Sequence, residues 1–229
     1  MKKILVIGNS DGIGLAVTKE LLANGYDVVG VSRSPSPITQ AFYNHVVCDV
    51  ISAKYKETLA SLQQAKGPFD VCIYCAGIGH TLDPNDLSKD VRVFQVNLMG
   101  AMFAAEVIIP TMTRAGAGHF VVLSSLGDEM LSSQVPSYFA SKAAMSSYFE
   151  GLALAVRPFG VFVTNVRFGF VDTKMAKGNK RPFMISPQKA SSLVMRCLRK
   201  RPVRFSYPKR MAIFVRIARW LMNLRIRFS

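Results

Sequence analysis

Acidic residues are scarce in this chain of 229 residues, and they are absent from its last quarter. There are 14 Asp and Glu against 29 Lys and Arg, and none of the acidic residues follows Asp172. Residues 1–172 hold 13 basic and 14 acidic side chains, so the net charge of +15 belongs almost entirely to residues 173–229. A tail this cationic indicates an anionic partner, either a lipid surface or nucleic acid.

Cysteines are also few. The four of them, Cys48, Cys72, Cys75 and Cys197, exclude a disulfide-rich secreted framework at this length and favour a reducing compartment, so we expect a cytoplasmic protein. Cys72 and Cys75 have the spacing of a metal or redox pair, but no second pair completes a zinc site. Both lie in an apolar, strand-like run, and we therefore expect buried thiols and no metal.

Internal repeats, low-complexity blocks and interdomain linkers are absent as well. The apolar run 4–7 ends at Gly8 and is too short for a signal peptide, so we expect it to be a strand. With 50% hydrophobic residues, the chain is predicted to form one domain over residues 1–208, followed by a basic amphipathic helix over residues 209–229.

Short apolar runs alternate with segments of helical periodicity along the chain. We expect strands at residues 3–7, 27–32, 46–49, 69–75, 118–125, 161–167 and 203–207, and helices at 15–23, 53–65, 89–100, 101–114 and 137–156. This alternation predicts an α/β fold with a doubly wound parallel sheet of the Rossmann type and helices on both faces.

A glycine-rich turn, Gly8-x-x-x-Gly12-x-Gly14, separates the first strand from the first helix. Bare backbone at a helix N-terminus lets N–H groups and the helix dipole meet a pyrophosphate. Three glycines alone indicate only a turn, and their spacing differs from the commoner dinucleotide fingerprint. Their position between a strand and a helix makes phosphate binding the better interpretation.

Tyr138 and Lys142 lie four residues apart in a helical segment, so they share one face. A phenol has a pKa of about 10, and its use as an acid and base near neutrality needs roughly 4 kcal/mol of anion stabilisation. One ammonium group at about 4 Å supplies that much at an effective dielectric constant of about 20. Taken alone, the pair is better explained as a surface Tyr and a solvated Lys.

With two further residues, Asn97 and Ser125, the chain resembles the short-chain dehydrogenase/reductase family over roughly residues 3–175. Asn97, Ser125, Tyr138 and Lys142 match the order and spacing of that family's catalytic tetrad. The cofactor positions that match are Gly8, Ser10, Asp11, Gly12, Ile13 and Gly14 in the loop, Asp49 and Val50 for adenine, Cys75, Ala76 and Gly77 after the fourth strand, and Gly169, Val171 and Thr173 for the nicotinamide amide.

Three residues depart from the family pattern. Ile7 replaces a Thr before the first glycine, Cys75 replaces an Asn, and Phe168 replaces a Pro. We expect these changes to alter the support of the site more than its chemistry.

The resemblance implies a nicotinamide-dependent oxidoreductase acting on a small-molecule carbonyl or alcohol. Tyr138 would be the general acid and base, and Ser125 would orient the reacting oxygen. Lys142 would lower the phenol pKa and bind the nicotinamide ribose, and Asn97 would hold a water molecule. The resemblance also implies a homo-oligomer, a dimer or tetramer, paired through helices over residues 98–114 and 137–156.

The end of the second strand predicts the choice of cofactor. An acidic side chain there would bind the ribose 2′-hydroxyl of NAD, whereas this chain has Ser32 followed by Arg33. A guanidinium group can pair with a 2′-phosphate, so we expect NADP, although Arg33 could also be a solvated loop residue and Asp11 adds a nearby negative charge.

Two other functions are consistent with parts of the sequence. A catalytically silent NADP-binding sensor or scaffold could keep this fold, although it would not need the Tyr138 and Lys142 pair. A nucleic-acid-binding protein would explain the basic tail, but no recognition motif supports it and we expect no nucleic acid partner.

Residues 210–227 have an amphipathic helical pattern. Ala212, Arg216, Arg219, Asn223 and Arg227 form one polar stripe, and Met211, Ile213, Phe214, Ile217, Trp220, Leu221 and Leu224 form a broad apolar face. The apolar stretch is about 21 Å long, too short to span a bilayer core of about 30 Å. It could lie on an anionic membrane, at the inner membrane surface, or dock on its own domain or on a partner subunit.

The segment after Thr173 mixes cationic and apolar residues, namely Lys174, Met175, Lys177, Lys180 and Arg181. This lid region could suit an acidic head group of a substrate, or it could simply be solvated. A membrane-surface enzyme would suit a lipid-like substrate.

Overall fold

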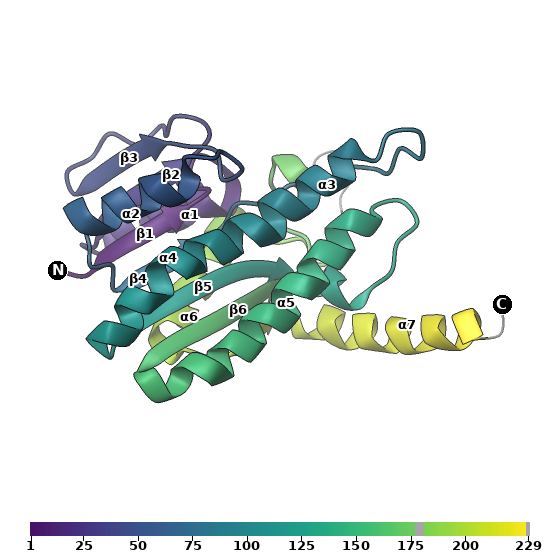
Figure 1. The fold of residues 1–229 in the computed structure, drawn as a ribbon. Coiled ribbons are helices and arrows are strands. Elements are labelled where there is room, and N and C mark those ends of the chain that lie inside the picture. The colour runs from purple at the N-terminus through teal and green to yellow at the C-terminus, as the bar shows by residue number, and fades with distance from the viewer. Residues whose placement is uncertain (177–180, 228–229) are drawn as a thin grey trace.

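Seven parallel strands form one sheet, with helices packed on its two faces (Figure 1). The computed structural model describes residues 1–176 and 181–227, and side chains as far as Leu221, so Lys177 and Lys180 of the predicted lid lie outside the described residues. The strands are β1 (Lys3–Ile7), β2 (Asp27–Ser32), β3 (Tyr43–Val47), β4 (Val71–Tyr74), β5 (Gly118–Ser125), β6 (Val161–Phe168) and β7 (Arg204–Tyr207), in the spatial order β3-β2-β1-β4-β5-β6-β7. The predicted doubly wound parallel sheet is confirmed.

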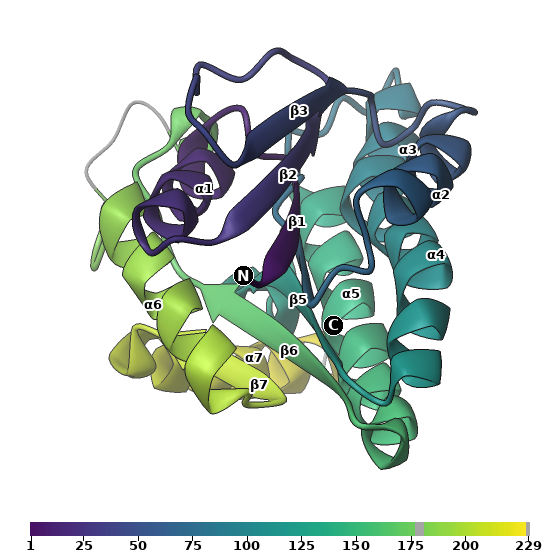
Figure 2. The same cartoon turned by 90° about the vertical axis from the view of Figure 1, so that its left-hand side faces the viewer.

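Helices cover both faces of the sheet (Figure 2). α1 (Gly12–Ala23) and α6 (Pro187–Lys200) lie on one face, and α2 (Tyr55–Ala65), α4 (Gly100–Ala115) and α5 (Pro136–Val156) lie on the other. The central strands contribute to both hydrophobic cores; in β1, for example, Leu5 packs in the cluster under α4 and Val6 in the cluster under α1. Burial on both faces explains why the strands are continuous apolar runs rather than alternating ones.

The order of the strands reverses between β1 and β4, and ligands bind at the carboxyl edge of parallel sheets at such a point. β1 leads there into the glycine loop, and β4 leads into residues 75–79. The candidate site therefore lies where these two loops meet.

The third strand was predicted at residues 46–49; the strand exists, but these bounds were wrong. β3 is Tyr43–Val47, because it pairs in register with β2 from Val28 opposite Tyr43 to Ser32 opposite Val47. The predicted adenine contacts, Asp49 and Val50, consequently lie in the loop that follows the strand rather than in it.

The two helices predicted at residues 89–100 and 101–114 form one continuous run. α3 (Ser88–Phe94) passes through a π-helical turn, Gln95–Met99, into α4. Within the described residues, this run, Ser88–Ala115, is the one helix long and apolar enough to cross a membrane, and half of its apolar window is buried inside the fold, as in a core helix.

α6 was not predicted. Ser186 caps it by accepting a hydrogen bond from Lys189 N at 3.1 Å, and Pro187 occupies the first turn. A Ser-Pro start is a recognised helix signal, so the sequence contained the information. The helix packs on α1, where Ser191 Oγ donates to Ala16 O at 3.2 Å.

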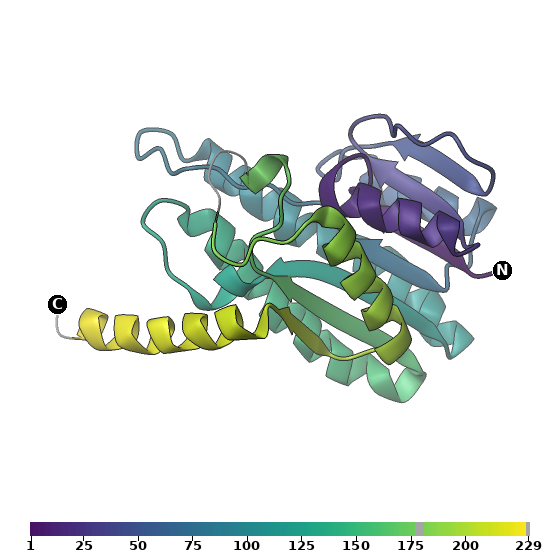
Figure 3. The ribbon, with the colours of Figure 1, turned by 180° about the vertical axis from the view of Figure 1, so that it is seen from behind.

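The last helix, α7 (Lys209–Arg227), begins after Pro208 at the carboxyl end of β7. It extends away from the sheet, past its carboxyl edge, as Figures 1 and 3 show. The side chains of Asn223, Leu224 and Arg227, which were assigned to its two faces, lie outside those that the structure describes.

Candidate active site

The loop between β1 and α1 is packed so closely that glycine is required at two positions. A Cβ at Gly8 would overlap the backbone N of Ala76, and one at Gly14 would overlap the carbonyl oxygen of Gly8. Gly8 also has φ of +82°, in the left-handed region that favours glycine. Ser10, Asp11, Gly12 and Ile13 complete the turn into α1, so the predicted glycine loop lies directly against the predicted segment after β4.

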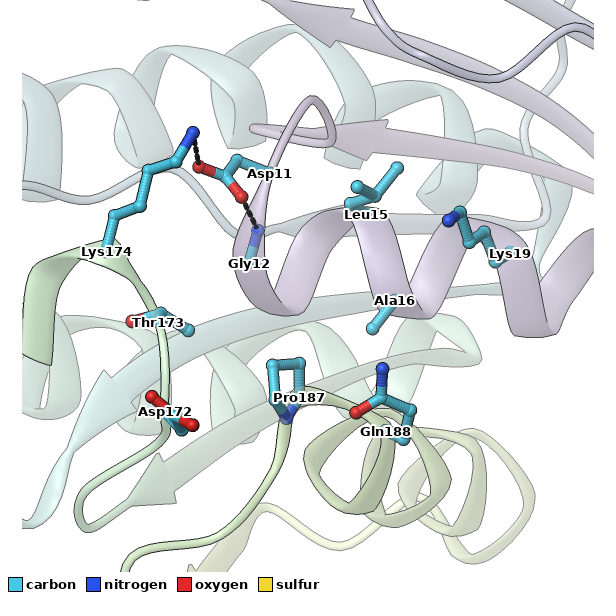
Figure 4. Close-up of a pocket in the computed structure, with 10 residues that line it drawn as sticks. All are labelled: Asp11, Gly12, Leu15, Ala16, Lys19, Asp172, Thr173, Lys174, Pro187 and Gln188. Carbon is cyan, nitrogen blue, oxygen red and sulfur yellow. Dashed lines mark hydrogen bonds and ion pairs between the residues drawn. The ribbon is translucent and has the colours of Figure 1, made fainter. Parts of the chain in front are cut away.

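Asp11 connects the start of α1 to the segment after β6. Its carboxylate accepts a hydrogen bond from Gly12 N at 2.7 Å and pairs with Lys174 Nζ at 2.7 Å (Figure 4). The Thr173 methyl group would lie 3.2 Å from a Cβ at Gly12. A hollow of about 340 Å³ opens beside this contact, between α1 and the start of α6, and its lining does not include Tyr138.

The adenosine end of the predicted site lies at the carboxyl ends of β2 and β3. Ser32 is buried and its hydroxyl donates to Ser34 O at 2.8 Å, whereas Arg33 is exposed. Asp49 lies 3.8 Å from the Arg92 guanidinium group, and Val50 is buried against α4. Arg33 is thus presented to solvent beside the glycine loop.

A series of hydrogen bonds that the sequence did not predict connects the residues after β2 to the glycine loop. Asn9 Nδ2 donates to Tyr43 Oη at 2.6 Å, Tyr43 Oη lies 3.0 Å from His45 Nδ1, and His45 Nε2 lies 3.1 Å from Ser34 O. A carbonyl oxygen only accepts, so Nε2 carries the proton and Nδ1 accepts from Tyr43. Burial lowers the pKa of His45, which keeps this neutral arrangement.

Asn97 lies in the π-helical turn, and its amide bridges three groups. Its Oδ1 accepts from Ile78 N at 2.8 Å, and its Nδ2 donates to Ile78 O at 2.9 Å and to Ser141 Oγ at 3.0 Å. Single π-helical turns occur often at functional sites because they re-aim side chains. Asn97 thereby holds the loop after β4 against α5, while the water molecule that the resemblance implies here stays a prediction.

Ser125, Tyr138 and Lys142 lie close together at the carboxyl end of β5. Ser125 ends the strand, and the other two side chains lie one turn apart on α5. Lys142 Nζ donates to Leu123 O at 2.8 Å and lies 5.9 Å from the centroid of the Tyr138 ring.

The loop after β4 lines the same space. A Cβ at Gly77 would lie 3.6 Å from Lys142 Nζ, and one at Gly79 would lie 3.1 Å from the Tyr138 ring. Gly79 was missed at the sequence level, although its position two residues beyond the matched Gly77 was a usable signal.

Burial determines the proton affinities of this pair. Burial raises the pKa of the Tyr138 phenol, and the Asp128 carboxylate raises this pKa further. A hydrogen bond with the Ser125 hydroxyl lowers it in part. Burial lowers the pKa of Lys142 to about 8, against the raising effects of Cys75 and Asp128. The lowered phenol pKa that we expected from Lys142 is not found in this structure, because burial disfavours the charged phenolate.

A buried ion pair that the sequence analysis missed lies beside the three side chains. Arg167 is 1% exposed, and its Nε donates to Asp128 Oδ2 at 2.6 Å while its Nη2 donates to Asp128 Oδ1 at 2.5 Å and to Glu129 Oε1 at 2.6 Å. Ser146 Oγ also donates to Asp128 Oδ2, at 2.5 Å. An arginine in a strand whose other residues are apolar or uncharged was a signal that a buried acidic partner exists.

The residues predicted to hold the nicotinamide amide are not gathered at one point. Thr173 lies against the glycine loop, whereas Val171 is buried and bridges to Ile185. Gly169 lies under α7, because a Cβ there would be 2.6 Å from Met211 Sδ. Of the three, Thr173 is the one placed to meet a cofactor in the loop.

The thiols of Cys72 and Cys75 are free. Burial raises the pKa of Cys75 to about 12, so it stays protonated, a form that binds metals poorly. Within the described residues, no group of three or more His, Cys, Asp and Glu side chains is arranged to hold a metal ion. The cytoplasmic location inferred from cysteine usage stays a prediction.

The residues around the glycine loop fit a dinucleotide. The loop has no side chains at Gly8, Gly12 and Gly14, and it leads into the N-terminus of α1, which favours an anion. Asn9 Oδ1 is buried beneath the loop without a hydrogen-bond partner among the described residues. Arg33 adds a cation at the far end, so the site could bind a pyrophosphate and a ribose phosphate.

Comparison with known proteins gives matches over most of the chain. The family model described as short chain dehydrogenase matches residues 2–182. An uncharacterized oxidoreductase of Myxococcus xanthus is 29% identical over 234 residues, covering 96% of this chain and 92% of the relative. A 3-ketodihydrosphingosine reductase of Bacteroides thetaiotaomicron is 31% identical over 172 residues, covering 74% of this chain and 64% of the relative.

The fold has close counterparts among solved structures. A short chain dehydrogenase from Burkholderia cenocepacia, solved in complex with NADP, matches with a TM-score of 0.86 and covers 99% of this chain and 98% of its own. It is 21% identical, a level at which the similarity speaks for the fold alone.

Proposed function

Because the chain belongs to the short-chain dehydrogenase family, we propose that it is an NADP-dependent oxidoreductase that interconverts a carbonyl and an alcohol. The observation that supports this most directly is that Ser125, Tyr138 and Lys142 lie beside the glycine loop. Gly8 contacts Ala76, and the next residue, Gly77, faces Lys142 Nζ. A dinucleotide cradle and a proton donor are therefore neighbours.

Bound NADPH would supply the hydride in the reductive direction. Tyr138 gives its proton to the substrate oxygen, Ser125 holds that oxygen by a hydrogen bond, and Lys142 stabilises the phenolate that remains. Burial raises the pKa of Tyr138, so the phenol carries its proton at neutral pH, before the transfer. Asn97 positions the loop that lines the reacting space.

A preference for NADP over NAD is proposed from Arg33. We expect Arg33→Asp to weaken NADPH binding by about 10- to 100-fold, because a charge-assisted bond to a phosphate is worth about 1.5–3 kcal/mol, and to weaken NADH binding little. Titration of both cofactors by fluorescence measures this. Arg199→Asp, at an exposed residue of α6, is the control. An unchanged ratio of the two affinities in Arg33→Asp would show that the residue does not select the cofactor.

An amphiphilic, lipid-like substrate is the class that we propose. The segment after β6 exposes Met175 and Phe183, and Arg181 stacks on Phe170 with 4.8 Å between the guanidinium carbon and the ring centroid. Apolar and cationic groups are thus combined in the segment that follows Thr173, which itself lies against the glycine loop. The relative from Bacteroides thetaiotaomicron, named for reduction of 3-ketodihydrosphingosine, supports the same class.

A homo-oligomer formed through α4 and α5 is proposed from the exposed face of α5. Small residues there, Ala140 and Gly151, alternate with Tyr148 and Leu154, of which Leu154 is 72% exposed. Close approach of two helices needs such a face.

We expect sedimentation velocity to give the mass of a dimer or tetramer, and Leu154→Arg to shift it toward the monomer by burying an unpaired charge in the interface. Phe42→Arg, at an exposed residue before β3, is the control. A monomer at every concentration of the unmodified chain would reject the proposal.

A further inference from the structure

α7 has an inner face that packs on the domain. Val215 is buried, and Met211 lies against Gly169, so a Cβ at that glycine would be 2.6 Å from Met211 Sδ. Arg216 Nε reaches Glu129 Oε2 at 3.5 Å. These contacts fix the first half of the helix to the loop that follows Ser125.

The outer face of α7 is apolar and uncovered. It consists of Ile213, Phe214, Ile217, Trp220 and Leu221, which are 53–67% exposed. At 100° per residue these five side chains lie within an arc of about 120°, opposite Val215. The domain therefore covers one side of the helix and leaves the more aromatic side in solvent, which argues against docking of the whole apolar face on the chain itself.

A mostly apolar hollow whose lining residues include three basic ones lies at the base of this outer face. It has a volume of about 360 Å³ and is lined by Phe183, Arg196, Phe205, Ser206, Tyr207, Pro208, Lys209 and Arg210. Arg210 precedes Phe214 and Ile217 by one and two turns, so the three share one side of α7. Basic groups thus border an apolar surface at the point where the helix leaves the domain.

We propose that α7 docks on the surface of an anionic lipid bilayer, with its outer face in the headgroup boundary and Arg196, Lys209 and Arg210 against lipid phosphates. An amphipathic helix with cations and an interfacial Trp suits this site. A second copy of the chain is the poorer occupant, because residues 173–229 contain 16 basic and no acidic side chains, so two such tails repel.

Docking would also orient the catalytic site. All seven strands are parallel, so α7 leaves the sheet at the same carboxyl edge that carries Ser125 and the glycine loop. Figure 1 shows α7 extending on the side of the loops before α3 and α5. The bilayer would then lie next to the carboxyl edge of the sheet, where the catalytic site lies. The docking itself does not depend on the proposed reaction.

Flotation of the full chain with lipid vesicles tests the docking. Vesicles of phosphatidylcholine alone are compared with vesicles that contain phosphatidylglycerol, at low and high salt. The variant F214S/W220S removes apolar area from the outer face, and R210E reverses one cation of the hollow. Matched controls are F42S/F159S and R114E, at exposed residues away from α7. Circular dichroism and sedimentation check that each variant is folded and record its mass.

We expect the unmodified chain to float with the anionic vesicles and less with neutral ones or at high salt. Binding should fall at least about tenfold in F214S/W220S, by several-fold in R210E, and not in the controls. Absence of flotation by the unmodified chain, or equal losses in F214S/W220S and F42S/F159S, would overturn the proposal. A fall in mass of F214S/W220S, with no vesicle binding by the unmodified chain, would instead assign the outer face to a second copy.

Discussion

Tyr138→Phe is expected to lower kcat by about 10²- to 10⁴-fold, the usual contribution of a general acid, while the affinity for NADPH stays the same. The substitution removes the hydroxyl group and keeps the ring, which packs beside Gly79 and Phe139. Loss of reduced-cofactor absorbance gives kcat, and fluorescence titration gives the cofactor affinity.

Tyr148→Phe is the matched control for Tyr138→Phe, because it removes the same hydroxyl group from an exposed position two to three turns along α5. It should leave kcat unchanged. Retention of full activity by Tyr138→Phe would remove Tyr138 from the chemistry, whatever the cofactor affinity.

Arg167→Met is expected to lower the free energy of unfolding by about 3–5 kcal/mol, because it leaves the Asp128 carboxylate buried and without its partner. Asp128 is 3% exposed at the side chain, so water cannot replace the guanidinium group. Urea unfolding followed by circular dichroism measures the change. Arg167→Lys keeps the positive charge but cannot form two parallel hydrogen bonds to Asp128. Its free energy of unfolding should therefore lie between those of the unmodified chain and Arg167→Met.

Arg199→Met, at an exposed residue of α6, is the control for Arg167→Met and should change stability by less than about 0.5 kcal/mol. A loss below about 1 kcal/mol in Arg167→Met would mean that the buried pair contributes little to the fold. The position of Asp128 next to Tyr138 and Lys142 would then need another explanation.

The sheet could be predicted from the sequence because its strands are buried on both faces and are therefore short apolar runs. β2 and β5 begin and end at the predicted residues. The edge strand β3 was misplaced, since it is half exposed and its register depends on pairing with β2 rather than on its own pattern. The resemblance to the family's catalytic tetrad likewise implied that Ser125, Tyr138 and Lys142 would lie close together.

Contacts between distant segments could not be predicted in the same way. The partners of Arg167 lie 38 and 39 residues away, and only the fold brings them together. The π-helical turn that aims Asn97 has no periodic signature, because the pattern on both sides of it is that of an α-helix. The shift in the Tyr138 pKa depends on burial, which the spacing of Tyr138 and Lys142 does not report.

The helical pattern of α7 predicted an apolar face but not which part of it the domain covers. Met211 was grouped with Phe214 and Trp220, yet it faces inward and the other two face outward. The division follows from where β7 ends and how α7 meets Gly169, and neither is visible in a helical projection.

The central claim is that this chain turns over a carbonyl substrate with NADPH, rather than binding the cofactor as a silent sensor. The most direct measurement is a turnover screen of the full chain with NADPH and a panel of carbonyl compounds that includes long-chain keto lipids, with Tyr138→Phe in parallel. We predict that at least one carbonyl causes oxidation of NADPH by the unmodified chain and not by Tyr138→Phe. Tight binding of NADPH with no oxidation by any member of the panel would contradict the account and favour the sensor.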